Sequence, residues 1–217
     1  MKTGILFDLD GTLLSSLEDL TDAVNYTLRH YGCPERTLRE INTFVGYGAY
    51  NLIRSALPGL ETDPTVEEAL AFYQDYYATH SQIKTRPYDG ILEALAEICK
   101  EFPVAVVSNK PDRATKPLCR DYFGSGIYAL GQRDETPKKP APDMLYKAME
   151  SIGVEKCIYV GDSEVDVQTA RNAGVPCLSV LWGFRDKACL TQHGATHFCD
   201  DPKNLPQCLK DMVSNGK

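Results

Sequence analysis

The chain has 217 residues, of which 43% are hydrophobic and 24% are charged, proportions that are ordinary for a globular protein. Its formal net charge of −7 excludes a general attraction to nucleic acid or anionic membranes, so an anionic substrate must be held by a few local positive groups. No apolar run approaches the roughly 20 residues of a membrane span, and the first residues lack the charged-then-apolar pattern of a secretory signal.

The eight cysteines are widely scattered and include no Cys-x-x-Cys pair. Several of them, such as Cys99, Cys157 and Cys177, lie in apolar segments typical of helices or strands. This distribution favours reduced structural thiols of a cytoplasmic protein over a disulfide framework or a zinc site.

An apolar run near the start of the chain ends abruptly in acidic residues. Ile5 to Phe7 have the composition of a buried strand, and Gly11 permits a sharp turn beyond it. Asp8 and Asp10 are two residues apart, so on a regular strand they point to the same side and repel unless a cation or a shared proton relieves them. This arrangement suits a nucleophile, an acid/base partner and a magnesium ion; the alternative is a polar strand end followed by an Asx turn.

Residues 15–82 predict helices and no convincing strand. The segment from Ser16 to Tyr31 carries apolar residues on one helical face, and Ser16 with Asp19 resembles a capping pair at its start. A glycine-bearing turn, Val45-Gly46-Tyr47-Gly48, precedes a further helical run from Ala49 to Ala56. We therefore expect a small helical module inserted after the first strand.

Beyond residue 83, strand-like segments alternate with helical ones. The predicted strands lie at residues 104–107, 127–130, 157–160, 177–181 and 197–199. Such alternation implies right-handed crossovers and a parallel, doubly wound sheet of the α/β class. Ligands bind beyond the carboxyl ends of the strands in these sheets, and each polar cluster of this chain lies directly after a predicted strand.

Four segments carry a resemblance to a known family. They are Asp8-Leu9-Asp10-Gly11-Thr12, Ser108-Asn109, Lys139-Pro140-Ala141-Pro142 and Gly161-Asp162-Ser163-Glu164-Val165-Asp166. In this order and strand context they closely resemble the haloacid dehalogenase superfamily of phosphotransferases, and within it the phosphoglycolate phosphatase-like branch. The resemblance covers nearly the whole chain. It implies a Rossmann-like core of residues 1–14 and 83–217 with a helical cap of residues 15–82.

The resemblance implies a role for each acidic residue. Asp8 would attack phosphorus and form an aspartyl-phosphate, and Asp10 would protonate the leaving alkoxide and later deprotonate water. Asp8, the backbone carbonyl of Asp10 and Asp162 are the implied ligands of a Mg²⁺ ion, which prefers hard oxygen ligands. Asp166 would act through water or from outside the ligand shell, or would simply be a solvated acid at a helix start. The role of Glu164 stays open.

The resemblance also implies a phosphate-binding set. Ser108 would bind a phosphoryl oxygen together with the backbone N–H groups of Gly11 and Asn109, and Thr12 would orient the loop. Lys139 would offset phosphate charge, because the lysine-proline-x-proline pattern selects it over Lys138. The four histidines stand outside every motif and are expected to serve the surface or the fold.

The expected function is that of a Mg²⁺-dependent phosphomonoester hydrolase acting on a small phosphorylated metabolite. In this branch the cap turn reaches toward the substrate, so Gly46 and Tyr47 are candidate specificity residues. Alternatives are a β-phosphoglucomutase-like mutase, a pyrophosphatase or nucleotidase of the same fold, and a non-enzymatic receiver-like module that holds phosphate on an aspartate. We expect a monomer or homodimer with no nucleic-acid or membrane partner.

Overall fold

The computed structural model describes residues 2–57 and 63–215, and the chain divides into two compact units. The core unit comprises Met1–Leu14 and Pro87–Lys217, and the helical unit comprises Ser15–Arg86. The chain passes from one to the other through β2 (Leu14–Ser15) and β3 (Arg86–Pro87), which pair as a short two-stranded sheet. In the described part of the chain, no helix has the length and apolar character needed to cross a membrane.

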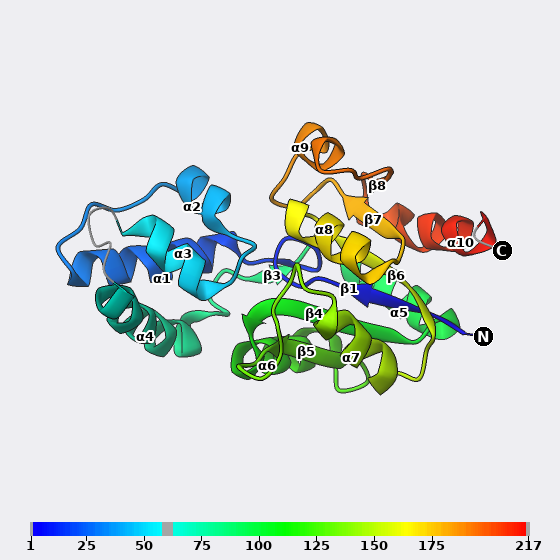
Figure 1. Ribbon diagram of the computed structural model, residues 1–217, viewed down its shortest axis with the longest axis horizontal. Coiled ribbons are helices and arrows are strands. Elements are labelled where there is room, and N and C mark those ends of the chain that lie inside the picture. Colours follow the sequence, from blue (N-terminus) through cyan, green and yellow to red (C-terminus); the bar gives the residue numbers. More distant parts are fainter. Residues whose placement is uncertain (1, 58–62, 216–217) are drawn as a thin grey trace. The chain divides into compact units, whose positions relative to one another are not determined.

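The core unit is built on a six-stranded parallel sheet with the order β5-β4-β1-β6-β7-β8 (Figure 1). The strands are β1 (Thr3–Phe7), β4 (Val104–Pro111), β5 (Tyr128–Gln132), β6 (Lys156–Gly161), β7 (Cys177–Val180) and β8 (His197–Cys199). The first strand lies between β4 and β6, and its apolar residues Ile5, Leu6 and Phe7 are fully buried. A continuous apolar run is what a strand covered on both faces requires.

Helices cover both faces of this sheet. They are α5 (Ile91–Glu101), α6 (Asp112–Phe123), α7 (Asp143–Ser151), α8 (Glu164–Ala173), α9 (Lys187–Gln192), the 3₁₀ turn η1 (Pro202–Asn204) and α10 (Leu205–Asn215). Successive residues of β1 enter opposite cores: Ile5 and Phe7 pack in a cluster with residues of α5, α6 and α10, whereas Leu6 packs with residues of α7 and α8. The expectation of a doubly wound parallel α/β fold is confirmed.

The helical unit contains α1 (Leu17–His30), α2 (Leu38–Phe44), α3 (Ala49–Ala56) and α4 (Asp63–His80). The expected capping pair at the start of α1 is wrong, because Ser16 makes no side-chain capping bond. The buried Asp19 carboxylate instead accepts hydrogen bonds from the backbone N–H groups of residues 83–85, at 2.8–3.0 Å. A tertiary demand for buried acceptors thus outweighs a local capping pattern.

Candidate active site

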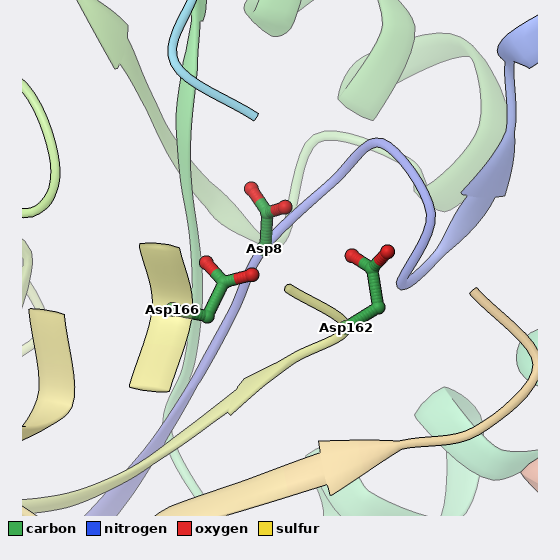
Figure 2. A group of neighbouring side chains, drawn as sticks. All are labelled: Asp8, Asp162 and Asp166. Atoms are coloured by element: carbon green, nitrogen blue, oxygen red, sulfur yellow. The ribbon is translucent and has the colours of Figure 1, made fainter. Parts of the chain in front are cut away.

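The acidic residues singled out in the sequence gather at the carboxyl ends of β1 and β6. Asp8 directly follows β1, and its backbone N–H donates to the Val160 carbonyl of the neighbouring strand at 2.8 Å. Asp162 directly follows β6, and Asp166 lies in the first turn of α8. Figure 2 shows the carboxyl groups of Asp8, Asp162 and Asp166 grouped around a common space. Adjacent parallel strands therefore bring together acids that are far apart in sequence.

These three carboxyl groups form a candidate metal centre. Each offers one oxygen atom, and the three oxygens lie within 4.8 Å of one another in a buried setting. Burial, with the nearby charge of Asp166, raises the pKa of Asp8 to about 7 and raises the pKa of Asp162 well above its ordinary value. Lys139 opposes this shift at Asp8. A set of crowded carboxylate oxygens fits a hard divalent cation such as Mg²⁺, which would relieve this cost of ionisation.

Lys139 supplies a buried positive charge to two of these acids. Its Nζ lies 2.8 Å from Asp8 Oδ1, 2.8 Å from Asp166 Oδ1 and 2.8 Å from the Tyr159 hydroxyl. Burial alone would lower the pKa of this ammonium, but the two carboxylates outweigh burial and raise it, so the lysine remains charged. The structure thus places Lys139 beside the acids, and its role in offsetting phosphate charge stays a prediction.

Asn109 holds the Lys139 backbone in place. The Asn109 side-chain amide donates to the Lys139 carbonyl at 2.9 Å, and its oxygen accepts from the Lys139 N–H at 2.8 Å. This reciprocal pair connects the end of β4 to the loop before α7, which carries no regular structure of its own at Lys139. The side chain of Asn109 thus orients the lysine, and phosphate binding by its backbone N–H stays a prediction.

The Asp166 carboxylate has several hydrogen-bond partners. It accepts from the Ser163 N–H and hydroxyl, from the Tyr159 hydroxyl and from Lys139. Burial would raise its pKa, but Lys139 and these hydrogen bonds lower it below the ordinary value, so Asp166 stays ionised. The reciprocal bonds with Ser163 form a capping box at the start of α8. The alternative of a solvated helix acid is wrong, because Asp166 is fully buried.

The turn after β1 orients Asp162. The Thr12 hydroxyl donates to Asp162 Oδ1 at 3.0 Å, and the Phe184 N–H donates to Asp162 Oδ2 at 2.7 Å. Gly11 has a φ of 88°, and a side chain there would collide with the Asp162 carboxylate, so only glycine fits. Trp182 supports the turn, since its indole N–H donates to the Thr12 carbonyl at 3.0 Å. Thr12 is therefore an orienting hydroxyl, and its direct contact with phosphate stays a prediction.

Asp10 has a partner of its own. Lys110 Nζ lies 2.9 Å from both carboxylate oxygens of Asp10, and the lysine side chain is only 4% exposed. Lys110 lies in β4 two residues after Ser108, because β4 continues to Pro111, beyond the predicted end of the strand. The Asp10 side chain is not one of the three carboxylates of the candidate metal centre, and metal binding by its backbone carbonyl stays a prediction.

Comparisons with known proteins agree with this geometry. The sequence profile of the haloacid dehalogenase-like hydrolase family matches residues 5–180, which is most of the chain. The chain belongs to this family. It is therefore an enzyme of the hydrolase class, and the resemblance inferred from the four motifs is confirmed.

Individual members of the haloacid dehalogenase-like family are also similar over nearly the whole chain. A protein named phosphoglycolate phosphatase 1 from Pseudomonas aeruginosa is 34% identical over 215 residues, which cover 94% of this chain and 78% of that protein. A phosphoglycolate phosphatase from Aquifex aeolicus is 34% identical over 83% of this chain and 85% of its own. A crystal structure from Lactobacillus delbrueckii, provisionally named a phosphoglycolate phosphatase, has a TM-score of 0.89 and 35% identity, covering 96% of this chain and 99% of that one.

The remaining predicted residues of this hydrolase lie in other surroundings. Glu164 begins α8, but its carboxylate pairs with Arg185, with Nε 2.8 Å from Oε2, and it is not among the three acids of the candidate metal centre. Gly46 and Tyr47 lie in the helical unit between α2 and α3. The proposed substrate contact of this turn stays a prediction.

Two residues of the site were missed in the sequence. Tyr159 looked like an ordinary core residue of β6, yet its hydroxyl contacts both Lys139 and Asp166. A tyrosine in a buried strand needs a hydrogen-bond partner, and that is the signal that could have found it. Lys110 could have been found as a lysine within the polar end of a buried strand, where an unpaired ammonium is costly.

Proposed function

We propose that this protein is a Mg²⁺-dependent phosphomonoester hydrolase, similar to phosphoglycolate phosphatase, that acts on a small phosphorylated metabolite. The observation that supports this most directly is the buried Lys139 ammonium placed 2.8 Å from Asp8, which itself lies beside Asp162 and Asp166. A lysine next to a carboxylate nucleophile offsets the repulsion between that carboxylate and a phosphate dianion. The names of the similar proteins from Pseudomonas aeruginosa and Aquifex aeolicus point to the same reaction class.

The reaction proceeds in two displacements on Asp8. An Asp8 carboxylate oxygen forms a bond to phosphorus while the bond to the ester oxygen breaks, and Asp10 gives its proton to the departing alkoxide. The aspartyl-phosphate is then attacked at phosphorus by water, whose proton returns to Asp10. Inorganic phosphate leaves and both carboxyl groups regain their starting states. Each displacement is easier than direct attack of water on the dianion.

Residues around Asp8 bind the phosphoryl group. The Ser108 hydroxyl and the backbone N–H groups of Gly11 and Asn109 donate to its oxygens, and Lys139 balances its charge. Asp8, Asp162 and the Asp10 carbonyl would hold Mg²⁺, with Asp166 supporting them. A bound ion would supply charge neutralisation and would polarise a phosphoryl oxygen.

The helical unit acts as a cap in this proposal. A cap excludes water from the charged groups during the reaction and presents specificity residues to the leaving group. Gly46 and Tyr47 are assigned to that role. Replacing Tyr47 with alanine is expected to change the relative kcat/KM values across a panel of phosphomonoesters; unchanged relative values would remove Tyr47 from the specificity set.

The reaction class is tested by phosphate release from p-nitrophenyl phosphate and from small phosphorylated metabolites, 2-phosphoglycolate among them. Wild-type protein is expected to release phosphate with Mg²⁺ and to lose this activity with EDTA. Asp8→Asn removes the nucleophile and is expected to lower kcat at least about 10³-fold. Circular dichroism of Asp8→Asn verifies that the variant is folded. Full activity in folded Asp8→Asn, or accumulation of aspartyl-phosphate without release in the wild type, would contradict the proposal.

A further inference from the structure

Lys110 and Lys139 each contact a different acid of the segment Asp8–Thr12. Lys139 contacts Asp8, whereas Lys110 contacts Asp10 with 2.9 Å to each carboxylate oxygen. The exposed fractions of the Lys110 and Asp10 side chains are 4% and 12%, so solvent does little to weaken this pair. The nucleophile and its acid/base partner thus each lie against a different buried ammonium.

The backbone at Lys110 is held on both sides. Its N–H donates to the Ser108 hydroxyl at 3.2 Å, and its carbonyl accepts from the Thr115 hydroxyl of α6 at 3.1 Å. The register between β4 and β5 shifts between Val107 and Pro111, so the strand is irregular where Lys110 lies. Irregularities of this kind often aim a side chain at a functional site. The backbone position of Lys110 is therefore fixed by hydrogen bonds and by the irregular strand.

A cation that contacts both oxygens of a carboxylate fixes the plane of that carboxylate. A general acid requires this, because proton transfer to a leaving oxygen depends on hydrogen-bond distance and direction. Asp10 lies on the turn after β1. Lys110 supplies the constraint from the neighbouring strand β4.

We propose that Lys110 is a positioning residue that orients the carboxyl group of Asp10 toward the leaving-group oxygen. The inference rests on the proposed function, in which Asp10 protonates that oxygen. Lys110 acts through Asp10 and contributes most when the leaving group departs as a strongly basic alkoxide. It contributes least when the leaving group is a stable phenolate that departs without protonation.

The test compares kcat/KM for 2-phosphoglycolate, an alkyl ester, and for p-nitrophenyl phosphate in wild type and Lys110→Met. This ratio reports the steps up to loss of the leaving group, so later hydrolysis of the aspartyl-phosphate does not enter it. Lys110→Met is expected to lower the value about 10- to 100-fold for the alkyl ester, part of the usual contribution of general acid catalysis, and less than about 3-fold for p-nitrophenyl phosphate. Equal losses for both esters, or no loss for either, would overturn the proposal.

Lys116→Met is the matched control, since Lys116 is about half exposed and pairs with Asp112 instead of with the site. Lys116→Met is expected to leave kcat/KM for both esters within about 2-fold of the wild-type values. Asp10→Asn serves as the reference and should show the same dependence on the leaving group as Lys110→Met. Adding Lys110→Met to Asp10→Asn should then cause little further loss for the alkyl ester, because the lysine acts only through Asp10.

Lys110→Arg keeps the proposal falsifiable if Lys110→Met fails to fold. Arginine retains the charge and a two-pronged contact, so it is expected to restore at least part of the wild-type ratio between the two esters. An arginine variant that is folded and loses activity equally on both esters would overturn the positioning role. Failure of the proposed function gives a different result, namely no phosphate release by wild-type protein from either ester.

Discussion

At the scale of single residues, the acids of this chain differ by the partners that the fold gives them. Asp8 and Asp162 are crowded and buried, and their pKa values are raised, whereas Asp166 stays ionised because Lys139, Ser163 and Tyr159 surround it. In the proposed mechanism, the same residue type serves as nucleophile, metal ligand or anchor according to its neighbours. Outside the site, the neighbours of Asp112 also set its pKa, with a smaller effect of burial.

Asp112→Asn is expected to lower the free energy of unfolding by about 1 kcal/mol at pH 7, after allowance for solvent screening. Burial raises the pKa of Asp112, but the Gly131 N–H, Lys116 and Arg133 together lower it below its ordinary value of 3.8. A carboxyl group with a lowered folded-state pKa stabilises the fold above the unfolded-state value and loses that effect as pH falls. Urea unfolding should therefore show a nearly constant difference between wild type and Asp112→Asn from about pH 7 to about pH 5, and a shrinking difference below about pH 4.

Asp121→Asn is the control for this comparison, because Asp121 is 40% exposed where it pairs with Arg120. It is expected to change the unfolding free energy by less than about 0.5 kcal/mol. A loss in Asp112→Asn that stays constant from about pH 5 down to about pH 2 would contradict the electrostatic account.

At the scale of elements, strand ends and helix starts position the polar groups. The turn after β1, the end of β6 and the start of α8 carry the acids. The end of β4 carries Ser108, Asn109 and Lys110, and the loop before α7 carries Lys139. In the helical unit, Asp19 of α1 has a comparable organising role. Its carboxylate accepts from the backbone of residues 83–85, which lead toward β3.

Asp19→Ala is expected to lower the free energy of unfolding by about 3 kcal/mol, because it leaves the N–H groups of residues 83–85, including that of the buried Thr85, without their charged acceptor. Asp22→Ala is a close control on the same helix: Asp22 pairs with Lys84 at 2.7 Å, but its side chain is 50% exposed. Asp22→Ala is expected to lower the free energy of unfolding by less than about 1 kcal/mol. Equal losses in the two variants, measured by urea unfolding, would show that Asp19 does not organise this segment.

At the scale of the whole molecule, cation binding and folding are coupled. Crowded acids favour protonation in the metal-free chain, so Asp8, with its pKa raised to about 7, binds more protons when folded than when unfolded. The sign is opposite to that of Asp112: metal-free stability decreases as pH rises from the unfolded value of 3.8 through about 7. A cation requires the ionised acids, so its stabilising effect increases over the same range.

Mg²⁺ at about 100 times its dissociation constant is expected to raise the melting temperature by about 5–10 °C at pH 8, and by less at pH 5.5. Asp162→Asn removes a carboxylate of the candidate metal centre and should abolish most of this gain. Glu164→Gln is the control, because Glu164 pairs with Arg185 outside the three-acid cluster, and it should retain the gain. Differential scanning calorimetry with and without EDTA measures the melting temperatures of the wild type and of both variants. An unchanged gain in Asp162→Asn would exclude this cluster as the cation site.

The sequence by itself determined the fold class and the order of the site segments. Apolar runs such as Ile5–Phe7 and Cys157–Val160 end in acids, and these patterns are local, so they can be recognised without the fold. Prediction from these local patterns failed where the pattern of apolar residues was weak. It missed α2, whose start is a capping box of Thr37 and Glu40 in a polar stretch, and it ended β4 before Ser108, Asn109 and Lys110.

Only the tertiary structure decided which charged groups meet. Lys139 reaches Asp8 across 131 residues, and Lys110 reaches Asp10 across 100, because β1 lies between β4 and β6. Sequence periodicity reports which face of an element is apolar, but it carries no information on which strands are neighbours or where a long side chain ends. The choice of partner for each acid is a property of the folded sheet.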